Sequence, residues 1–246
     1  MKALPLIALF ALAGVAGATE ETSPPAPLVL DDLEFEWRDA RSSSVEIRSD
    51  NGRSSTTVKR ERLSDASGLD ANGPVRFAVA AEAGRAECSG IRKGARAKGK
   101  CRFVSSPAYE TGLAQRGVEL ERRSDLFALA LVDARLALVD ELSRDRLAPA
   151  ESGDLIAATA LGVTGAWAHD LREAGLDIAE FDDLIAARAL KLDGEFMRAM
   201  AAAGYPRLSA RQAITMKAIG VTPSYAAAMN RAADAAQRVE GMGGLQ

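Results

Sequence analysis

Three stretches of the C-terminal half share one pattern and decide the fold: LGVTGAW at residues 161–167, LKLDGEF at 190–196 and IGVTPSY at 219–225. Each stretch ends in an aromatic residue, so Trp167, Phe196 and Tyr225 recur at a spacing of 29. Tyr109 lies three such periods before Phe196, and Leu138 takes the aromatic position one period before Trp167. Self-similarity at a fixed period of this length is the sequence signature of a stack of repeated structural units.

Other residue classes recur at the same period. A large apolar residue stands four positions after the aromatic in every unit: Leu113, Leu142, Leu171, Met200 and Met229. Glycine recurs at 117, 175 and 204, and an Asp-Leu pair recurs at 125–126, 154–155 and 183–184. Because residues i and i+4 share one face of a helix, the aromatic and its Leu or Met partner predict a helix with that face buried.

The ends of these helices are also marked in the sequence. Residues typical of helix N-caps precede the aromatics: Ser106, Thr164, Asp193 and Thr222. Pro107 and Pro223 take the first helical position, where the missing N–H costs nothing. Gly175 and Gly204 stand where a left-handed residue ends a helix. The linking segments carry a second, shorter helix, such as residues 182–190, so each unit is predicted to be a helix pair.

The predicted α-helical repeat stack occupies residues 106–239 and holds one half unit and four pairs, nine helical segments in all. One pair buries too little apolar surface alone, and stacking neighbours makes the core continuous. Ser209 and Gln212 predict a capping box in the last pair. Arg135 stands where the other units have a cap, with no Gly or Pro near it, so a single longer helix is predicted from Ser124 to Arg146.

The N-terminus has the order of a secretory signal peptide. Lys2 supplies a positive start, residues 3–13 are apolar, and small residues stand at Ala16 and Ala18 before a polar run. Cleavage is therefore expected after residue 18. An uncleaved membrane anchor is the alternative, but this apolar run is shorter than the roughly 20 residues that span a bilayer.

The flanks of the mature chain are predicted to lack regular structure. Residues 19–27 (TEETSPPAP) read as a flexible leader, and residues 240–246 (EGMGGLQ) as a disordered tail. The net charge of −3 becomes −4 when Lys2 is removed. This charge is ordinary; we expect no nucleic-acid partner, and no transmembrane anchor once the signal is cleaved.

Residues 28–105 carry β signals. Leu33, Phe35 and Trp37 alternate with acidic residues, which is typical of a strand with one buried face. Asn51-Gly52 indicates a hairpin turn. We predict a small antiparallel sheet of five or six strands, with a poorly defined stretch around residues 60–73. The fold class is therefore α+β: a small antiparallel sheet followed by a helical repeat stack of 29-residue period.

The last hairpin of this region can be placed in register. If Gly94-Ala95 is a two-residue turn, paired residues sum to 189, and Cys88 falls opposite Cys101. Opposed Cα atoms of an antiparallel pair lie about 4.5–5.5 Å apart, within the range that a disulfide tolerates. We predict a Cys88–Cys101 disulfide. A metal site lacks two further ligands, and a redox-active pair would more often have a CxxC motif.

The same hairpin carries a run of basic residues on an acidic protein: Arg92, Lys93, Arg96, Lys98, Lys100 and Arg102. Because strand side chains alternate, Cys101 and Phe103 should point to one face and Lys98, Lys100 and Arg102 to the other. The functional interpretation is a ridge that binds a phosphate- or carboxylate-bearing polymer. The alternative is an ordinary solvated face, with Arg102 opposite Glu87.

The phrase GVTPSYAAAMNRAA at residues 220–233, with GVTGAWAHDLREAGL at 162–176, resembles the tandem G-V-T-P-x-[YF]-x-x-x-[LM] repeats of many uncharacterised exported bacterial proteins. Similar repeats occur in extracytoplasmic parts of some transmembrane metallopeptidases of the β-lactam-sensor type. The resemblance covers residues 106–233 and implies an envelope location and a sensing context. It carries no catalytic residue across, because the zinc motif HExxH is absent and His169 is the only histidine.

Motifs of catalysis and cofactor binding are missing from the sequence. It has no G-x-S-x-G, no P-loop, no GxGxxG and no EF-hand pattern, and a single histidine cannot build a histidine metal cluster. We therefore predict no catalytic residue, metal or cofactor. Carboxylates are numerous enough for a two-carboxylate hydrolase, but Glu34 and Glu36 are read as the exposed face of the first strand.

These features predict an exported, non-enzymatic binding or scaffolding protein of the bacterial cell envelope, periplasmic or extracellular. Its helical surface, with the basic hairpin, would bind a partner protein or an anionic polymer. The alternative is a carboxylate-dependent hydrolase acting on a cell-wall polymer.

Overall fold

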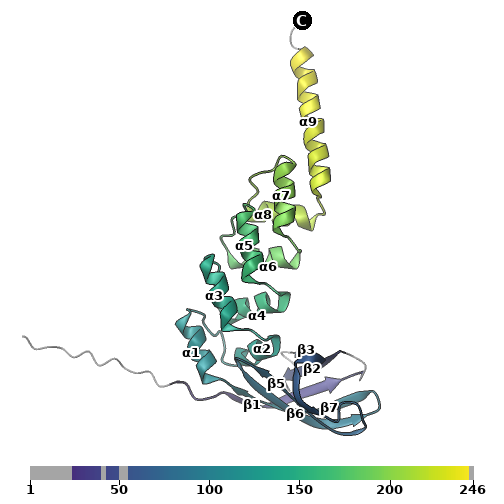
Figure 1. Cartoon of the computed structure of the whole chain (residues 1–246), viewed down its shortest axis with the longest axis vertical. Helices are drawn as coiled ribbons and strands as arrows, with labels where there is room; N and C mark the ends of the chain where they lie inside the picture. The colour runs from purple at the N-terminus through teal and green to yellow at the C-terminus, as the bar shows by residue number, and fades with distance from the viewer. Residues whose placement is uncertain (1–23, 40–42, 50–54, 244–246) are drawn as a thin grey trace, which may run out of the picture.

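The computed structural model describes residues 24–39, 43–49 and 55–243. Within this part of the chain a seven-stranded antiparallel sheet is followed by nine helices (Figure 1). The α+β prediction is confirmed. The sheet ends at Ser105 and the first helix begins at Pro107, where the sequence placed the boundary.

The sheet strands are β1 (Val29–Trp37), β2 (Ser44–Ser49), β3 (Ser55–Lys59), β4 (Leu63–Ser67), β5 (Gly73–Ala81), β6 (Gly84–Lys93) and β7 (Arg96–Ser105). Their order across the sheet is β3-β2-β1-β7-β6-β5-β4, so the first strand pairs with the last. Alternate residues are buried along β1 from Leu33 to Trp37, as the apolar pattern predicted, and also along much of β6 and β7. The predicted turn at Asn51-Gly52 lies outside the described residues.

The sheet has seven strands rather than the five or six expected. The extra strand is β4, in the stretch 60–73 that the sequence left undefined, directly after a short 3₁₀ turn, η1 (Arg60–Arg62). This edge strand is short and polar, it pairs with β5 on one side only, and its register shifts around Asp65, whose φ is positive. A strand with one partner and little apolar alternation gives almost no sequence signal.

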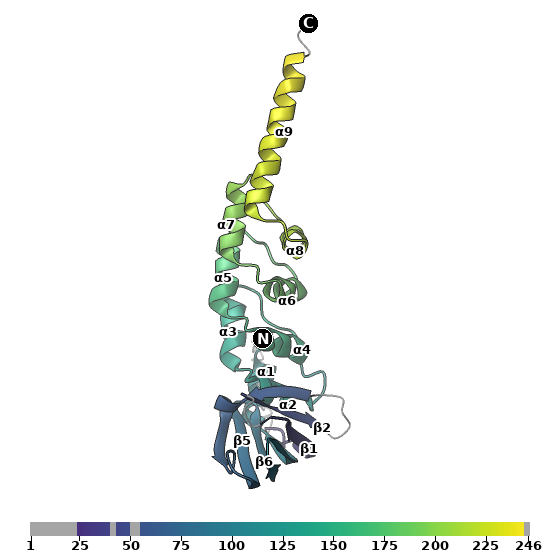
Figure 2. The same cartoon turned by 90° about the vertical axis from the view of Figure 1, so that its right-hand side faces the viewer.

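The helices are α1 (Pro107–Gln115), α2 (Asp125–Val132), α3 (Leu136–Arg144), α4 (Ser152–Leu161), α5 (Gly165–Glu173), α6 (Phe181–Ala189), α7 (Gly194–Ala202), α8 (Ala210–Ala218) and α9 (Pro223–Gly243). They form two rows. The odd-numbered helices contact one another in succession, as do the even-numbered helices (Figure 2). The rows rise from the sheet as an elongated body that ends in α9 (Figure 1).

The single helix predicted from Ser124 to Arg146 is wrong, because this segment forms α2 and α3. The break is at Asp133, which has a φ of 65° and ends α2 in the left-handed conformation. Asp tolerates this conformation better than most residues that carry a Cβ. Gly and Pro are the usual sequence signals of a helix end, and an Asp at this point does not mark one.

Most of the predicted helix ends are confirmed. Each of the four expected N-caps accepts a hydrogen bond from the backbone N–H three residues on: Ser106, Thr164, Asp193 and Thr222. Ser209 and Gln212 form the predicted capping box. Gly175 and Gly204 have positive φ. At the C-terminus α9 continues to Gly243, so residues 240–243 are helical rather than part of a tail; the alanine-rich sequence before them favours propagation of the helix.

The buried apolar residues form two clusters that meet at α3 and α4. One fills the inside of the curled sheet and is closed by α1 and α2, where the ring of Phe127 packs on that of Phe103 at a centroid distance of 5.4 Å. The other runs between the two helix rows, with Leu142, Leu171 and Met200 fully buried. The outward face of the sheet is therefore free of helices, and this face carries the candidate site.

Candidate anion-binding groove

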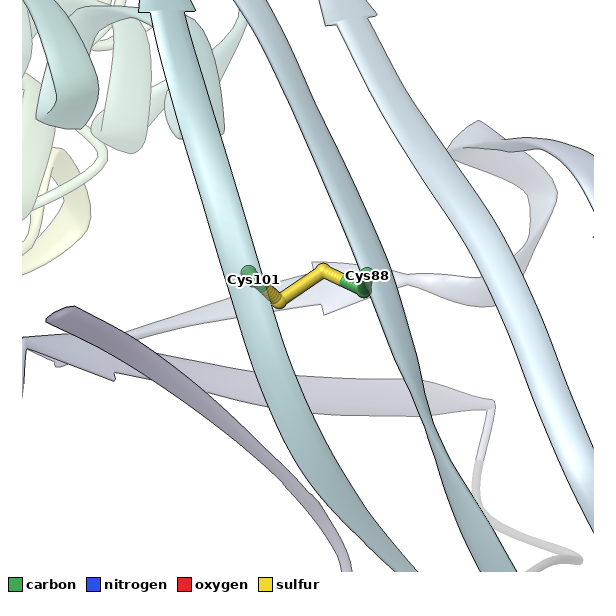
Figure 3. The surroundings of a disulfide bond; sticks show 2 residues. All are labelled: Cys88 and Cys101. Carbon is green, nitrogen blue, oxygen red and sulfur yellow. A yellow bond between two sulfur atoms is a disulfide. The ribbon is translucent and has the colours of Figure 1, made fainter. Parts of the chain in front are cut away.

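The β6–β7 hairpin has the predicted register. Lys93 pairs with Arg96 and Cys88 pairs with Cys101, and Gly94 in the turn has a positive φ. The two cysteines form a disulfide between the paired strands (Figure 3). Both are almost completely buried on the inner face of the sheet.

The predicted facing of β7 is also confirmed. Cys101 and Phe103 are buried, whereas Lys98, Lys100 and Arg102 are exposed on the outer face. The neighbouring strand on one side is β1, whose outward residues are acidic: Glu34 lies opposite Lys100 and Glu36 lies opposite Lys98.

A groove of about 1000 Å³ runs over this outer face, across β2, β1, β7 and β6. Its charged lining residues are Glu34, Glu36, Arg48, Lys93, Arg96, Lys98 and Lys100. Five of these side chains are basic and two are acidic, a net charge of +3 on a chain whose own net charge is −3. A hollow with one dominant sign of charge concentrates counter-ions of the opposite sign.

Two glycines form part of the lining of the groove. Gly90 and Gly99 are paired across the hairpin. A Cβ added to Gly99 would lie 2.1 Å from the carbonyl oxygen of Ser89 and 2.6 Å from the ring of Phe35. The two strands and the buried Phe35 therefore approach too closely for any larger residue at this position, which is on the inner face with Cys101.

Some of the predicted basic residues are neutralised within the protein. The ammonium of Lys100 lies 3.3 Å from a carboxylate oxygen of Glu34, and the guanidinium of Arg102 lies 3.3 Å from that of Asp31. Arg102 does face Glu87 across the strands, but Glu87 forms its ion pair with Arg85 instead. These two cations fit the interpretation of an ordinary solvated face.

Three others have no such neutralisation. Lys93, Arg96 and Lys98 are exposed, line the groove, and have no carboxylate within 4.0 Å among the described residues. Arg92 is placed differently from the rest of the ridge: it is only half-buried at the inward-facing position, and its Nε donates to the carbonyl of Gly94. The structure thus divides the six predicted residues into an unpaired group of three, two paired cations, and Arg92.

The acidic residues of the groove are tied to cations. Arg48 on β2 lies 3.6 Å from Glu34 and 3.5 Å from Glu36, and Arg38 lies 3.6 Å from Glu36. The two acids therefore link β1 to Arg48 of β2 on one side of the groove. The other side, next to the β6–β7 turn, keeps its positive charge.

The sequence reasoning missed several lining residues. Glu34 and Glu36 belong to β1, whose place beside β7 has no local signal, and Arg48 belongs to β2, on the other side of β1. The glycine pair did have one, because 90 and 99 sum to 189 and thus fall opposite each other in the register already derived. Ile91, which is 48% exposed, adds an apolar contact next to the unpaired cations.

A second, smaller hollow of about 360 Å³ lies on the same outer face, over β4 to β7. Its charges largely cancel, since the guanidinium of Arg85 contacts both Asp65 and Glu87. It offers no surplus of unpaired charge comparable with that of the groove.

The single histidine does not form part of the groove. His169 is exposed on α5, with its Nδ1 3.2 Å from Asp145 and its Nε2 3.4 Å from Glu173. A hydrogen bond and the charge of Asp145, with a smaller effect of Glu173, raise the pKa of His169 above its ordinary value. In the described ranges no group of three or more His, Cys, Asp or Glu side chains could hold a metal ion, and no helix has the length and apolarity to cross a membrane.

Comparison with known proteins gives no match to a family model, to a curated protein or to a solved structure.

Proposed function

We propose that this is an exported, non-enzymatic binding and scaffolding protein of the bacterial cell envelope, whose sheet binds an anionic polymer in the groove. The observation that carries the proposal is the group of three unpaired cations, Lys93, Arg96 and Lys98, along the far side of a net-positive groove. The helical rows would hold this sheet at a distance from whatever their far end contacts.

The scaffold is proposed to be a stack of 29-residue units. The boundaries of the odd-numbered helices support this period, because they begin at residues 107, 136, 165, 194 and 223. The left-handed residues support it too. They stand at 133, 162, 191 and 220 after one row and at 117, 146, 175 and 204 after the other. Each unit would then consist of one odd-numbered helix and the even-numbered helix that follows it.

Contacts between successive units recur at the same interval. The carboxylate of Glu141 accepts a hydrogen bond from the first backbone N–H of α5, and that of Asp170, 29 residues later, accepts from the first N–H of α7. An acidic group at a helix N-terminus is stabilised by the helix dipole. Pro223 begins α9 and has no N–H that needs an acceptor. The residue of α7 that corresponds to Asp170 is Ala199, which has no carboxylate.

Export is supported by two features. The Cys88–Cys101 pair at disulfide distance is consistent with an oxidising compartment. The signal peptide expected at residues 1–18 lies outside the described residues, as do residues 19–23 of the expected leader. Within that leader, Ala26 is held by Arg123, which donates to its carbonyl. The resemblance to exported proteins with GVTPxY-type repeats points to the same compartment.

The second candidate is a carboxylate-dependent hydrolase of a cell-wall polymer, because Glu34 and Glu36 line the groove. A hydrolase of this kind needs one carboxyl group that carries a proton to the leaving group. Both acids here form ion pairs with Arg48 and do not stand free in the groove. Turnover of a cell-wall polymer that Glu34→Gln abolishes would establish the hydrolase and overturn the proposal.

Binding is tested by titrating the mature protein with polyphosphate and with polyglutamate at low and at physiological salt. Replacing Lys93, Arg96 and Lys98 together by Ser should weaken binding at least tenfold. The binding should also weaken with added salt, since exposed charges are screened within about 10 Å at 0.1 M. Binding that is unchanged in this variant would return the three cations to the solvated-face interpretation.

The matched control removes three exposed cations elsewhere. Arg207, Arg211 and Arg231 lie in the helical part and have no ion pair among the described residues. Replacing them by Ser changes the net charge equally and should alter polymer binding less than twofold. An equal loss in both variants would mean that the polymer responds to net charge and not to the groove.

A further inference from the structure

The first two turns of α9 expose large apolar residues whose counterparts in α7 are buried. Tyr225 and Met229 are 58% and 51% exposed. The residues 29 positions earlier in α7, Phe196 and Met200, are 8% and 0% exposed. Helix α7 contacts α9, and Lys217 of α8 lies over the ring of Phe196. The outward face of α9 thus has the composition of an internal contact face without a neighbour to cover it.

The rest of α9 has little support from its own chain. Ala226 is buried against α7, and the amide of Asn230 donates to the carbonyl of Ala203 over 2.7 Å. Beyond Asn230 every side chain that the structure describes is exposed. Both views show the helix projecting past α7 and α8 (Figures 1 and 2). The projecting part is residues 231–243. Because an isolated helix as short as this is marginally stable in water, it should gain stability from a partner.

The exposed residues form one seam along the helix. Tyr225, Met229, Ala232 and Ala236 follow one another at intervals of four, three and four residues. This is the a/d spacing of a coiled coil, in which two helices pack side by side. The seam lies on a different side of α9 from Ala226 and Asn230, so a second helix could pack here without displacing α7.

We propose that α9 pairs in antiparallel orientation with α9 of a second copy of this chain. The size gradient of the seam argues for a copy of itself: the two large residues lie at one end and the two small ones at the other. In an antiparallel pair Tyr225 falls opposite Ala236, and Met229 falls opposite Ala232. Each large side chain then meets the gap left by a small one, as knobs-into-holes packing requires.

The flanks of the seam argue the same way. The residues beside it are Ala228, Ala233 and Ala235, all small and uncharged. Charged flanking residues are the usual means by which a coiled coil selects a different partner or rejects its own copy. No charged side chain stands beside the seam between Tyr225 and Ala236, and alanine flanks let two backbones approach closely. A two-fold pair of this kind uses the same surface on both copies.

The test is the oligomeric state of the mature protein, measured by sedimentation equilibrium between about 1 and 200 μM, concentrations that bracket micromolar affinity. The parent should form dimers. Met229→Glu and Tyr225→Glu should each raise the dimer dissociation constant at least tenfold, with unchanged circular dichroism because both sites are exposed in the single chain. Arg231→Glu, on the far side of α9, should leave the constant within twofold.

A parent that stays monomeric over this range overturns the proposal, even if the seam captures a helix of another protein. So does a loss of dimer with Arg231→Glu equal to that with Met229→Glu. Orientation is tested by mixing copies that carry Ala228→Cys with copies that carry Ala235→Cys. In the antiparallel pair the mixed disulfide should exceed either same-site disulfide; a preference for same-site disulfides would mean a parallel pair and overturn the antiparallel arrangement.

Discussion

Truncation of Phe196 tests whether the recurring aromatics are core residues of the helical rows. The ring is 8% exposed and lies under Lys217, whose ammonium is 4.5 Å from the ring centroid. Loss of the buried apolar surface costs about 2–3 kcal/mol, and the residual cavity raises the total for a buried Phe to about 3–5 kcal/mol. Since 1 kcal/mol shifts the melting temperature of a chain this long by about 2–4 °C, Phe196→Ala should melt about 10 °C below the parent.

The matched variant is Tyr225→Ala, at the equivalent position of α9. Tyr225 is 58% exposed, so its truncation in the monomer should change the free energy of unfolding by no more than about 0.5 kcal/mol. Met200→Ala and Met229→Ala repeat the comparison four residues on, where exposure is 0% and 51%. Thermal melts at monomeric concentration decide the matter. Equal losses at the buried and the exposed sites, or no loss at Phe196, would refute the assignment of these residues to a stacked core.

Three further predictions concern other parts of the chain. Lys191 has a φ of 54° where the neighbouring units place glycine, so Lys191→Gly should raise the free energy of unfolding in urea by about 1 kcal/mol. Asp145 raises the pKa of His169 above its ordinary value near 6.5. Protonated His169 therefore stabilises the fold at lower pH, and this contribution is lost as the pH rises through the raised pKa. The drop in melting temperature between about pH 6 and 8 should be smaller in His169→Gln than in the parent. Mass spectrometry of the exported protein should find Thr19 as its first residue, and thiol labelling under denaturing, non-reducing conditions should find no free cysteine; intact Met1 or two free thiols would contradict export.

Features with local chemistry could be predicted from the sequence. The four N-caps and the capping box at Ser209 depend on side chains within three residues of the helix start, and all were found. The register of the last hairpin followed from one turn, and the position of Cys101 opposite Cys88 followed from the register. In each case the residues that interact are close in sequence or related by a single sum.

Features that depend on distant neighbours could not be predicted. Lys100 and Arg102 looked as free as Lys98, because nothing local indicates that β1 lies beside β7 and brings Glu34 and Asp31 to them. The break at Asp133 had a periodic signal, since Gly162 lies 29 residues later, but the residue type concealed it. The exposure of α9 follows from the absence of a covering helix in the described structure, which the sequence of α9 does not encode.

The pairing of β1 with β7 has a kinetic consequence. Val29 lies against Val104, a separation of 104 − 29 = 75 residues, whereas the helices of each row contact one another about one unit apart. Contacts between distant residues form slowly because a long loop must close before they are made. During synthesis one edge of β1 can pair with β2, but its other edge stays unpaired until β7 has emerged. A nascent chain halted before β7 would present the edges of β1 and β6 that β7 covers in the finished sheet, and it is at this stage that a chaperone would protect it best.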